Sequence, residues 1–100
     1  MEWQFTAELW AYGDEPGSWH FVTLPREVAD DVRDHASAGG PRRGFGSIRV
    51  SVTIGSTTWR TSLFPEAKGG SMVLPVKKAV RLAEGVEAGD DCAVVVEVLE

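Results

Sequence analysis

The sequence predicts a mainly β protein with two short helices, folded as a small closed barrel. Several segments alternate apolar and polar residues with the period of a β-strand. Two prolines, each preceded by a leucine, open helical patterns. The order strand, strand, Leu-Pro-helix, strand occurs in residues 3–54 and again in residues 59–99. Because each copy alone would expose an apolar sheet face, we expect both to close on one another as one domain over residues 1–100, a barrel of about eight strands.

The first copy begins with an alternating segment over residues 3–10. Its apolar residues share one face: Trp3, Phe5, Ala7 and Leu9. Residues 13–18 are rich in turn formers, and residues 19–24 are expected to form the second strand. Pro25 suits the first turn of a helix, where its missing N–H would be unpaired anyway. Apolar residues then recur at helical spacing, at Val28, Val32 and Ala36, until residues 39–41 end the helix.

Residues 47–63 predict a β-hairpin whose register is fixed by its turn. Gly55-Ser56 fits a two-residue type II′ turn, so residue 54 should pair with residue 57. The apolar face then pairs Ile48 with Leu63, Val50 with Thr61 and Val52 with Trp59. The polar face pairs Arg49 with Ser62, Ser51 with Arg60 and Thr53 with Thr58. A slip of one residue would mix the two faces, which supports this register.

The second copy follows the same order. Residues 71–74 predict a short strand, Pro75 opens a helix, and Gly85 ends it. The expected buried stripe of this helix is Val76, Ala79, Val80 and Ala83. Residues 92–99 are nearly all apolar and predict the last strand, with Cys92 as a small buried residue. In the repeat, residues 3–9 match 59–63, residues 21–25 match 71–75, and residues 48–54 match 93–99.

Three blocks of the sequence resemble a known family. RGFGSIRVSVTIG, TTWRTSLFP and MVLPVKKAVRLAEGVEAGD are similar to segments of the bacterial DUF1905 family, a domain of unknown function, in the expected order over nearly the whole chain. The resemblance implies a double-split β-barrel, distantly like the barrels that AbrB and MazE regulators build from two short chains. Here one chain would hold both halves, so we expect a monomer or a weak homo-oligomer. The family implies no established activity and no agreed site residues.

Charge is segregated along the chain, whose formal net charge is −5. Residues 1–40 carry two arginines against eight acidic residues, a net of −6. Residues 41–81 carry eight basic residues against Glu66, a net of +7, and residues 82–100 carry six acidic residues and no basic one. The net negative charge argues against general affinity for nucleic acid or an anionic membrane. The basic middle either neutralises the acidic ends across the fold or forms a local anion site.

Six residues of the basic middle are the candidate ligand-binding site: Arg49, Ser51, Arg60, Ser62, Lys77 and Lys78. Arginine forks bind carboxylate or phosphate bidentately, and neighbouring hydroxyls add donors. The two lysines, with Arg81, follow the predicted helix start, where free N–H groups favour anions. Arg42 and Arg43 among glycines are a weaker phosphate candidate, because the motif lacks the lysine-serine end of a P-loop. The alternative is a solvated sheet and helix face whose charges pair with the acidic ends.

The sequence offers no catalytic constellation. His20 and His35 lie far apart, no cysteine–histidine spacing suggests a metal, and no serine sits in a nucleophile-elbow motif, so we expect no catalytic residue, metal or cofactor. No apolar run suits a membrane helix, the N-terminus is unlike a signal peptide, and a single cysteine argues for a cytoplasmic protein.

The function predicted from the sequence is a non-catalytic binding module for an anionic small molecule or a partner segment. The main alternative is a DNA-binding regulator like AbrB or MazE, which comes from the fold resemblance alone. It is the less favoured one, because only one of the two Leu-Pro helices is basic: PVKKAVR against PREVADD. An enzyme of unknown reaction is the third hypothesis.

Overall fold

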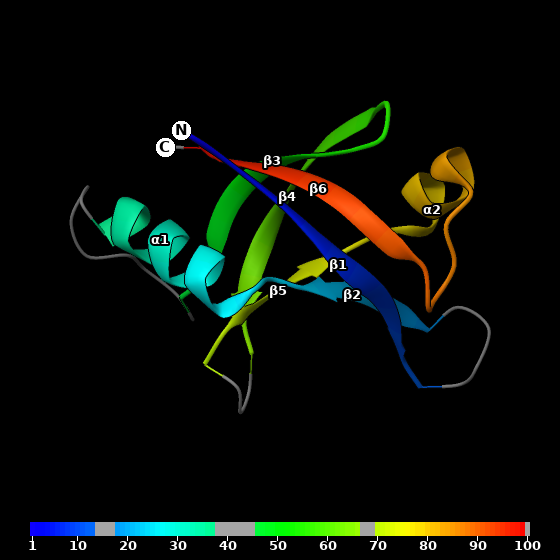
Figure 1. The fold of residues 1–100 in the computed structure, drawn as a ribbon, viewed down its shortest axis with the longest axis horizontal. Coiled ribbons are helices and arrows are strands. Elements are labelled where there is room, and N and C mark those ends of the chain that lie inside the picture. The colour runs from blue at the N-terminus through cyan, green and yellow to red at the C-terminus, as the bar shows by residue number, and fades with distance from the viewer. Residues whose placement is uncertain (14–17, 38–45, 67–69, 100) are drawn as a thin grey trace.

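The computed structural model describes residues 1–13, 18–37, 46–66 and 70–99. They form a closed antiparallel barrel in the order β1-β2-β5-β4-β3-β6 (Figure 1). Its strands are β1 (Glu2–Tyr12), β2 (Trp19–Thr23), β3 (Ile48–Ile54), β4 (Thr57–Pro65), β5 (Met72–Pro75) and β6 (Asp91–Val98). Two helices complete it, α1 (Arg26–Ser37) and α2 (Lys78–Glu84). The predicted class, mainly β with two short helices in a closed barrel, is confirmed.

The described barrel has six strands, so the expectation of about eight was too high. The reason lies in the long strands, each of which pairs with different neighbours along its length. Residues 2–8 of β1 pair with β6, whereas its residues 9–12 pair with β2. In β4, residues 57–63 pair with β3 and residues 64–65 with β5. β1 and β4 each pair with two neighbours in this way, so the six strands that the sequence predicts individually are enough to close the barrel.

The β3–β4 hairpin has the predicted register. Ile48 pairs with Leu63 and Val52 with Trp59, and the turn falls at Gly55-Ser56. Gly55 has a φ of 61°, which glycine adopts at little cost and which the first central position of a type II′ turn requires. The turn geometry and the alternation of the strands thus select the same register.

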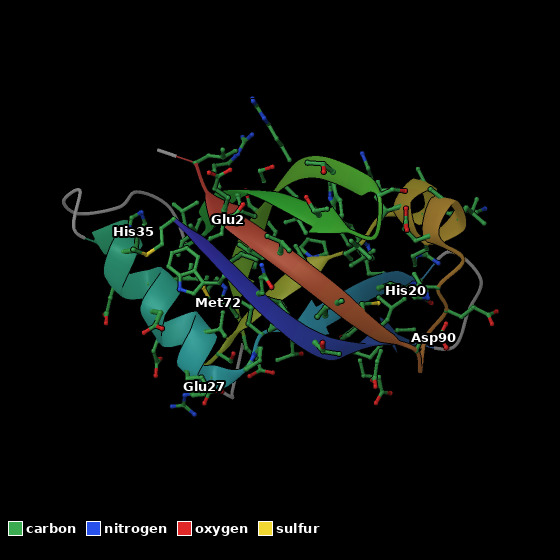
Figure 2. All side chains as sticks on the ribbon, turned by 45° about the horizontal axis from the view of Figure 1, so that its top comes forward. Glu2, His20, Glu27, His35, Met72 and Asp90 are labelled. Atoms are coloured by element: carbon green, nitrogen blue, oxygen red, sulfur yellow. The ribbon has the colours of Figure 1, made fainter. Side chains whose placement is uncertain are left out.

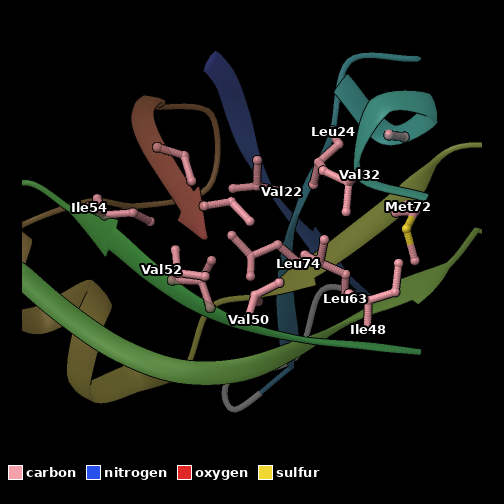
Figure 3. Close-up of a cluster of buried hydrophobic side chains, with 14 of the residues drawn as sticks. Val22, Leu24, Val32, Ile48, Val50, Val52, Ile54, Leu63, Met72 and Leu74 are labelled. Atoms are coloured by element: carbon pink, nitrogen blue, oxygen red, sulfur yellow. The ribbon is translucent and has the colours of Figure 1, made fainter. Parts of the chain in front are cut away.

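The barrel is filled by the inward-facing apolar side chains of all six strands (Figure 3). Fully buried members include Leu9, Val22, Val50, Leu63, Leu74 and Val96. Burying one such side chain contributes roughly 1.5–3 kcal/mol, so this cluster is the main source of stability. Cys92 is also buried, as predicted, and burial first of all, followed by the charges of Asp90 and Asp91, raises the pKa of its thiol.

The two helices lie at opposite ends of the barrel (Figure 1). α1 follows Pro25 directly, as predicted, and buries Ala29, Val32 and Ala36. α2 begins later than predicted, because the N–H of Val76 donates to the carbonyl oxygen of His20 at 2.9 Å and so continues the strand pairing. Neither helix of the described residues is long and apolar enough to cross a membrane.

The buried stripe predicted for α2 is only partly correct. Val76 and Val80 are buried, but Val76 precedes the helix, and Ala79 and Ala83 are exposed. Helical spacing alone does not decide which stripe of a short helix meets the core. α2 therefore contributes one buried residue, Val80, to the end of the barrel that it covers.

Candidate anion-binding pocket

A cavity of about 500 Å³ lies beside α2. Three segments line it: residues 18–20 at the start of β2, residues 59–61 and 64 of β4, and residues 75–78 with Arg81 at the start of α2. At the other end of the barrel, α1 buries Ala29, Val32 and Ala36 against the core. α2, with 7 residues, buries Val80 at this end and lies beside the cavity.

Four cationic side chains line this cavity: Arg60, Lys77, Lys78 and Arg81. Within the described ranges none of them pairs with a carboxylate, and the ion pair found there joins Arg33 to Asp30 in α1, at 3.0 Å. Four like charges around one hollow repel each other, and in a protein with a net charge of −5 they form a local positive field. The cavity is therefore electrostatically suited to an anion.

The remaining walls are largely aromatic and aliphatic. Trp59 and Val76 supply buried surface, while Phe64 and Trp19 are exposed, Trp19 to 68%. The Trp19 ring stacks on Phe21, with centroids 6.1 Å apart and an interplanar angle of 12°, so the wall extends along the outer face of β2. An organic body could bury apolar surface here while its charged group meets the cations.

His20 and Arg81 contact each other at the edge of the cavity. His20 Nδ1 lies 2.8 Å from the carbonyl oxygen of Ser18, which can only accept, so Nδ1 carries the proton. Nε2 is then an acceptor, and Arg81 Nη1 lies 3.5 Å from it, while Arg81 Nε donates to the carbonyl oxygen of Val76 at 3.3 Å. These contacts orient the Arg81 guanidinium without neutralising its charge. Figure 2 labels His20 at this end of the molecule and His35 at the other.

Glu84, the last residue of α2, is engaged away from the cavity. Its carboxylate accepts hydrogen bonds from the Thr57 hydroxyl and, at 3.4 Å, from the N–H and the hydroxyl of Ser56. The Thr57 bond is the main reason why its pKa lies below the usual glutamate value. A Cβ on Gly55 would lie 1.9 Å from Oε1, so a larger residue there would displace the Glu84 carboxylate from its present position. The helix is thus tied to the β3–β4 turn by an acid that does not neutralise the cations.

The structure divides the predicted site residues into two groups. Arg60, Lys77 and Lys78 line the cavity together. The other three, Arg49, Ser51 and Ser62, lie on the outer face of the β3–β4 hairpin and are not among the lining residues. On that face Ser51 lies between Arg60 and Glu97, which brings a carboxylate from β6 into the neighbourhood. Arg42 and Arg43 lie outside the described residues.

Sequence reasoning missed the aromatic walls and His20 as site residues. Their segments are far from the basic middle in sequence, so no local pattern connects them. The sequence places Arg81 close to the two lysines, and the basic middle is the signal that points to this region. Among the described residues there is no group of three or more His, Cys, Asp or Glu side chains that could hold a metal ion.

Comparison with known proteins gives a family. A sequence model described as a domain of unknown function, DUF1905, matches residues 5–96. All the residues that line the cavity fall within this range. No curated protein matches the chain.

Proposed function

The chain belongs to the DUF1905 family, and we propose that its cavity beside α2 binds a carboxylate or phosphate group carried on an apolar or aromatic body. One observation carries the proposal: four cations without a carboxylate partner in the described chain surround a hollow whose other walls are aromatic and aliphatic. An anion would relieve the repulsion among the cations, and the Arg60 and Arg81 guanidinium groups could each form two hydrogen bonds to it.

The proposal is for binding rather than catalysis. His20 is the imidazole that lines the cavity, and both of its ring nitrogens have partners, Ser18 and Arg81. The Nε2 contact places His20 beside a permanently charged guanidinium, an arrangement that suits the binding of an anion. The contacts of His20 are those of a positioning residue that orients the Arg81 guanidinium.

We also propose that the barrel is a double-split barrel built from two equivalent halves. Exchanging β1, β2 and β3 for β4, β5 and β6 leaves the strand order unchanged. The registers agree with this exchange: Thr23 pairs with Val73 between β2 and β5, and Val52 pairs with Val96 between β3 and β6.

A twofold axis that related the two halves would pass through these two pairs, so that each residue pairs with its own counterpart. This fixes how the two halves align. The counterpart of residues 48–54 becomes residues 92–98, one position earlier than the alignment made from the sequence. This shift keeps inward-facing residues matched with inward-facing ones. Under the same exchange α1 is the counterpart of α2, and Val32 is the counterpart of Leu82.

Thermal unfolding with phenyl phosphate tests the anion site. A ligand at ten times its Kd should stabilise the native protein by about 1.4 kcal/mol, which raises Tm. Arg60→Ala should abolish most of this rise. Arg49→Ala is the matched control, because Arg49 lies on the same hairpin but does not line the cavity, and it should keep the rise. Sodium chloride at the same ionic strength controls for screening.

Two results would contradict the proposal. One is a Tm that does not change with phenyl phosphate; the other is an equal loss in both arginine variants. A labelled DNA duplex, titrated in parallel at several salt concentrations, tests the DNA-binding alternative, which requires an affinity that falls steeply with salt.

A further inference from the structure

The second edge of β4 is open along the cavity. From Thr57 to Leu63 this strand pairs with β3 on one side, whereas β5 pairs with it only at Phe64 and Pro65. No other strand of the described residues pairs with β4 along this edge between Thr57 and Leu63, although α2 lies beside its beginning, where Glu84 accepts a hydrogen bond from Thr57. An open strand edge presents N–H and C=O groups that can pair with another chain.

The hydrogen-bond pattern shows which residues face this edge. The carbonyl oxygen of Arg49 accepts from the N–H of Leu99 at 2.9 Å, so the backbone of Arg49 points away from β4. Its partner Ser62 therefore belongs to a non-hydrogen-bonded pair, and such pairs alternate along an antiparallel ladder. Arg60, two residues from Ser62, likewise directs its N–H and C=O away from β3, toward the open edge.

The cavity lies along this edge. Trp59, Arg60 and Thr61 are consecutive and point to alternate faces of the strand, yet all three line the cavity. Only a hollow beside the strand can contact both of its faces at once. At the opposite end, residues 2–8 of β1 likewise pair only with β6, and Trp3 packs against His35 of α1 at a centroid distance of 5.6 Å. α2 lies beside β4 through the contact of Glu84 with Thr57, so the stretch of β4 that remains open is the one at Arg60, along the cavity.

We propose that the anionic ligand is an extended acidic peptide segment of a partner protein, which adds to β4 as a further strand within the cavity. This inference rests on the proposed anion site and names its ligand. Alternate side chains of such a segment would lie on opposite faces. Its acidic residues would meet Arg60 and the cations of α2, while its apolar residues would contact Trp59 and Val76. A second copy of the chain fits less well, because its own β4 edge would bring another set of cations against the first.

A short peptide of alternating glutamate and leucine is the probe, measured by calorimetry against the whole chain. A matched peptide is N-methylated on the residue that pairs with Arg60, which removes one donor and blocks the approach of the backbone while keeping charge and side chains. We expect the unmodified peptide to bind at least about tenfold more tightly than the methylated one. In hydrogen exchange, the Arg60 amide should become protected only with the unmodified peptide.

The outcomes separate this inference from the anion site itself. If both peptides bind equally and phenyl phosphate displaces them, the cavity binds anions but adds no strand, and the inference is wrong. If phenyl phosphate binds and neither peptide does, the inference is also wrong, while the anion site stands. If the complex contains two copies of the chain and no peptide, the edge serves self-association, which overturns the inference too.

Discussion

The two ends of the barrel carry corresponding elements and differ in how they are closed. At one end α1, with 12 residues, covers the core with Ala29, Val32 and Ala36. At the other end α2, with 7 residues, buries only Val80 and leaves a cavity of about 500 Å³. Both helices follow a Leu-Pro pair at the end of a short strand. The longer helix is the one that buries three residues against the core, and the shorter helix is the one beside the cavity.

The charged side chains differ in the same way. In α1, Arg33 pairs with Asp30 and donates to the backbone carbonyl oxygens of Gly70 and Ser71. At the α2 end, Arg81 contacts the carbonyl oxygen of Val76 and the ring of His20 and has no carboxylate partner in the described chain. Arg33 is therefore held by an ion pair and hydrogen bonds within the protein, whereas the charge of Arg81 remains available to a ligand.

The largest expected effect compares Val32 with Leu82, which are counterparts in the proposed repeat. Val32 is fully buried, whereas Leu82 is 72% exposed. Val32→Ala should lower the free energy of unfolding by about 2 kcal/mol, because it opens a cavity under α1. Leu82→Ala should change it by less than about 0.5 kcal/mol, although it removes a larger side chain. Urea unfolding measures both, and similar losses would show that α2 packs as tightly as α1.

An intermediate effect on stability is expected at Arg33 and not at Arg81. Arg33→Ala should cost about 1 kcal/mol of stability, because the carbonyl oxygens of Gly70 and Ser71 lose a donor. Arg81→Ala should leave stability nearly unchanged but weaken the binding of phenyl phosphate. Chemical unfolding and calorimetry on both variants check this, and the reverse assignment of the two losses would contradict the comparison.

The smallest effect concerns the pH dependence at Glu84. Its folded-state pKa lies below the usual value of 4.5, chiefly through the hydrogen bond from Thr57. The stability that it contributes is therefore fully present above the unfolded-state pKa and is lost as the pH falls through the folded-state pKa. Wild type should be slightly more stable than Glu84→Gln at pH 7, with the gap closing at acidic pH. A gap that persists undiminished in acid would mean that the charge of Glu84 does not tie α2 to the hairpin.

The local parts of the fold could be predicted from the sequence, and the parts set by distant contacts could not. The register of β3 and β4 follows from a two-residue turn and two alternating strands, which are all adjacent in sequence. The start of α2 depends instead on the bond from Val76 to His20, residues that are far apart in the chain. Proline at position 75 suggested a helix start that this pairing delays.

The candidate site was predictable only through its charge. The basic stretch pointed to Arg60, Lys77 and Lys78, which do line one cavity. The basic stretch could not distinguish Arg60 from Arg49, because both arginines lie on the outer face of the hairpin. Arg60 reaches the cavity because it lies on the open edge of β4. Trp19 and His20 reach the site through the closure of the barrel, which no local pattern encodes.

The contrast between the two ends is tested most directly by NMR titration with phenyl phosphate, followed through the tryptophan indole signals. Trp59 and Trp19 line the cavity, whereas Trp3 contacts His35 at the α1 end. We expect the Trp59 and Trp19 signals to shift together and to saturate, while the Trp3 signal stays in place. A Trp3 signal that moves as far as that of Trp59, or a spectrum that does not respond, would contradict the account.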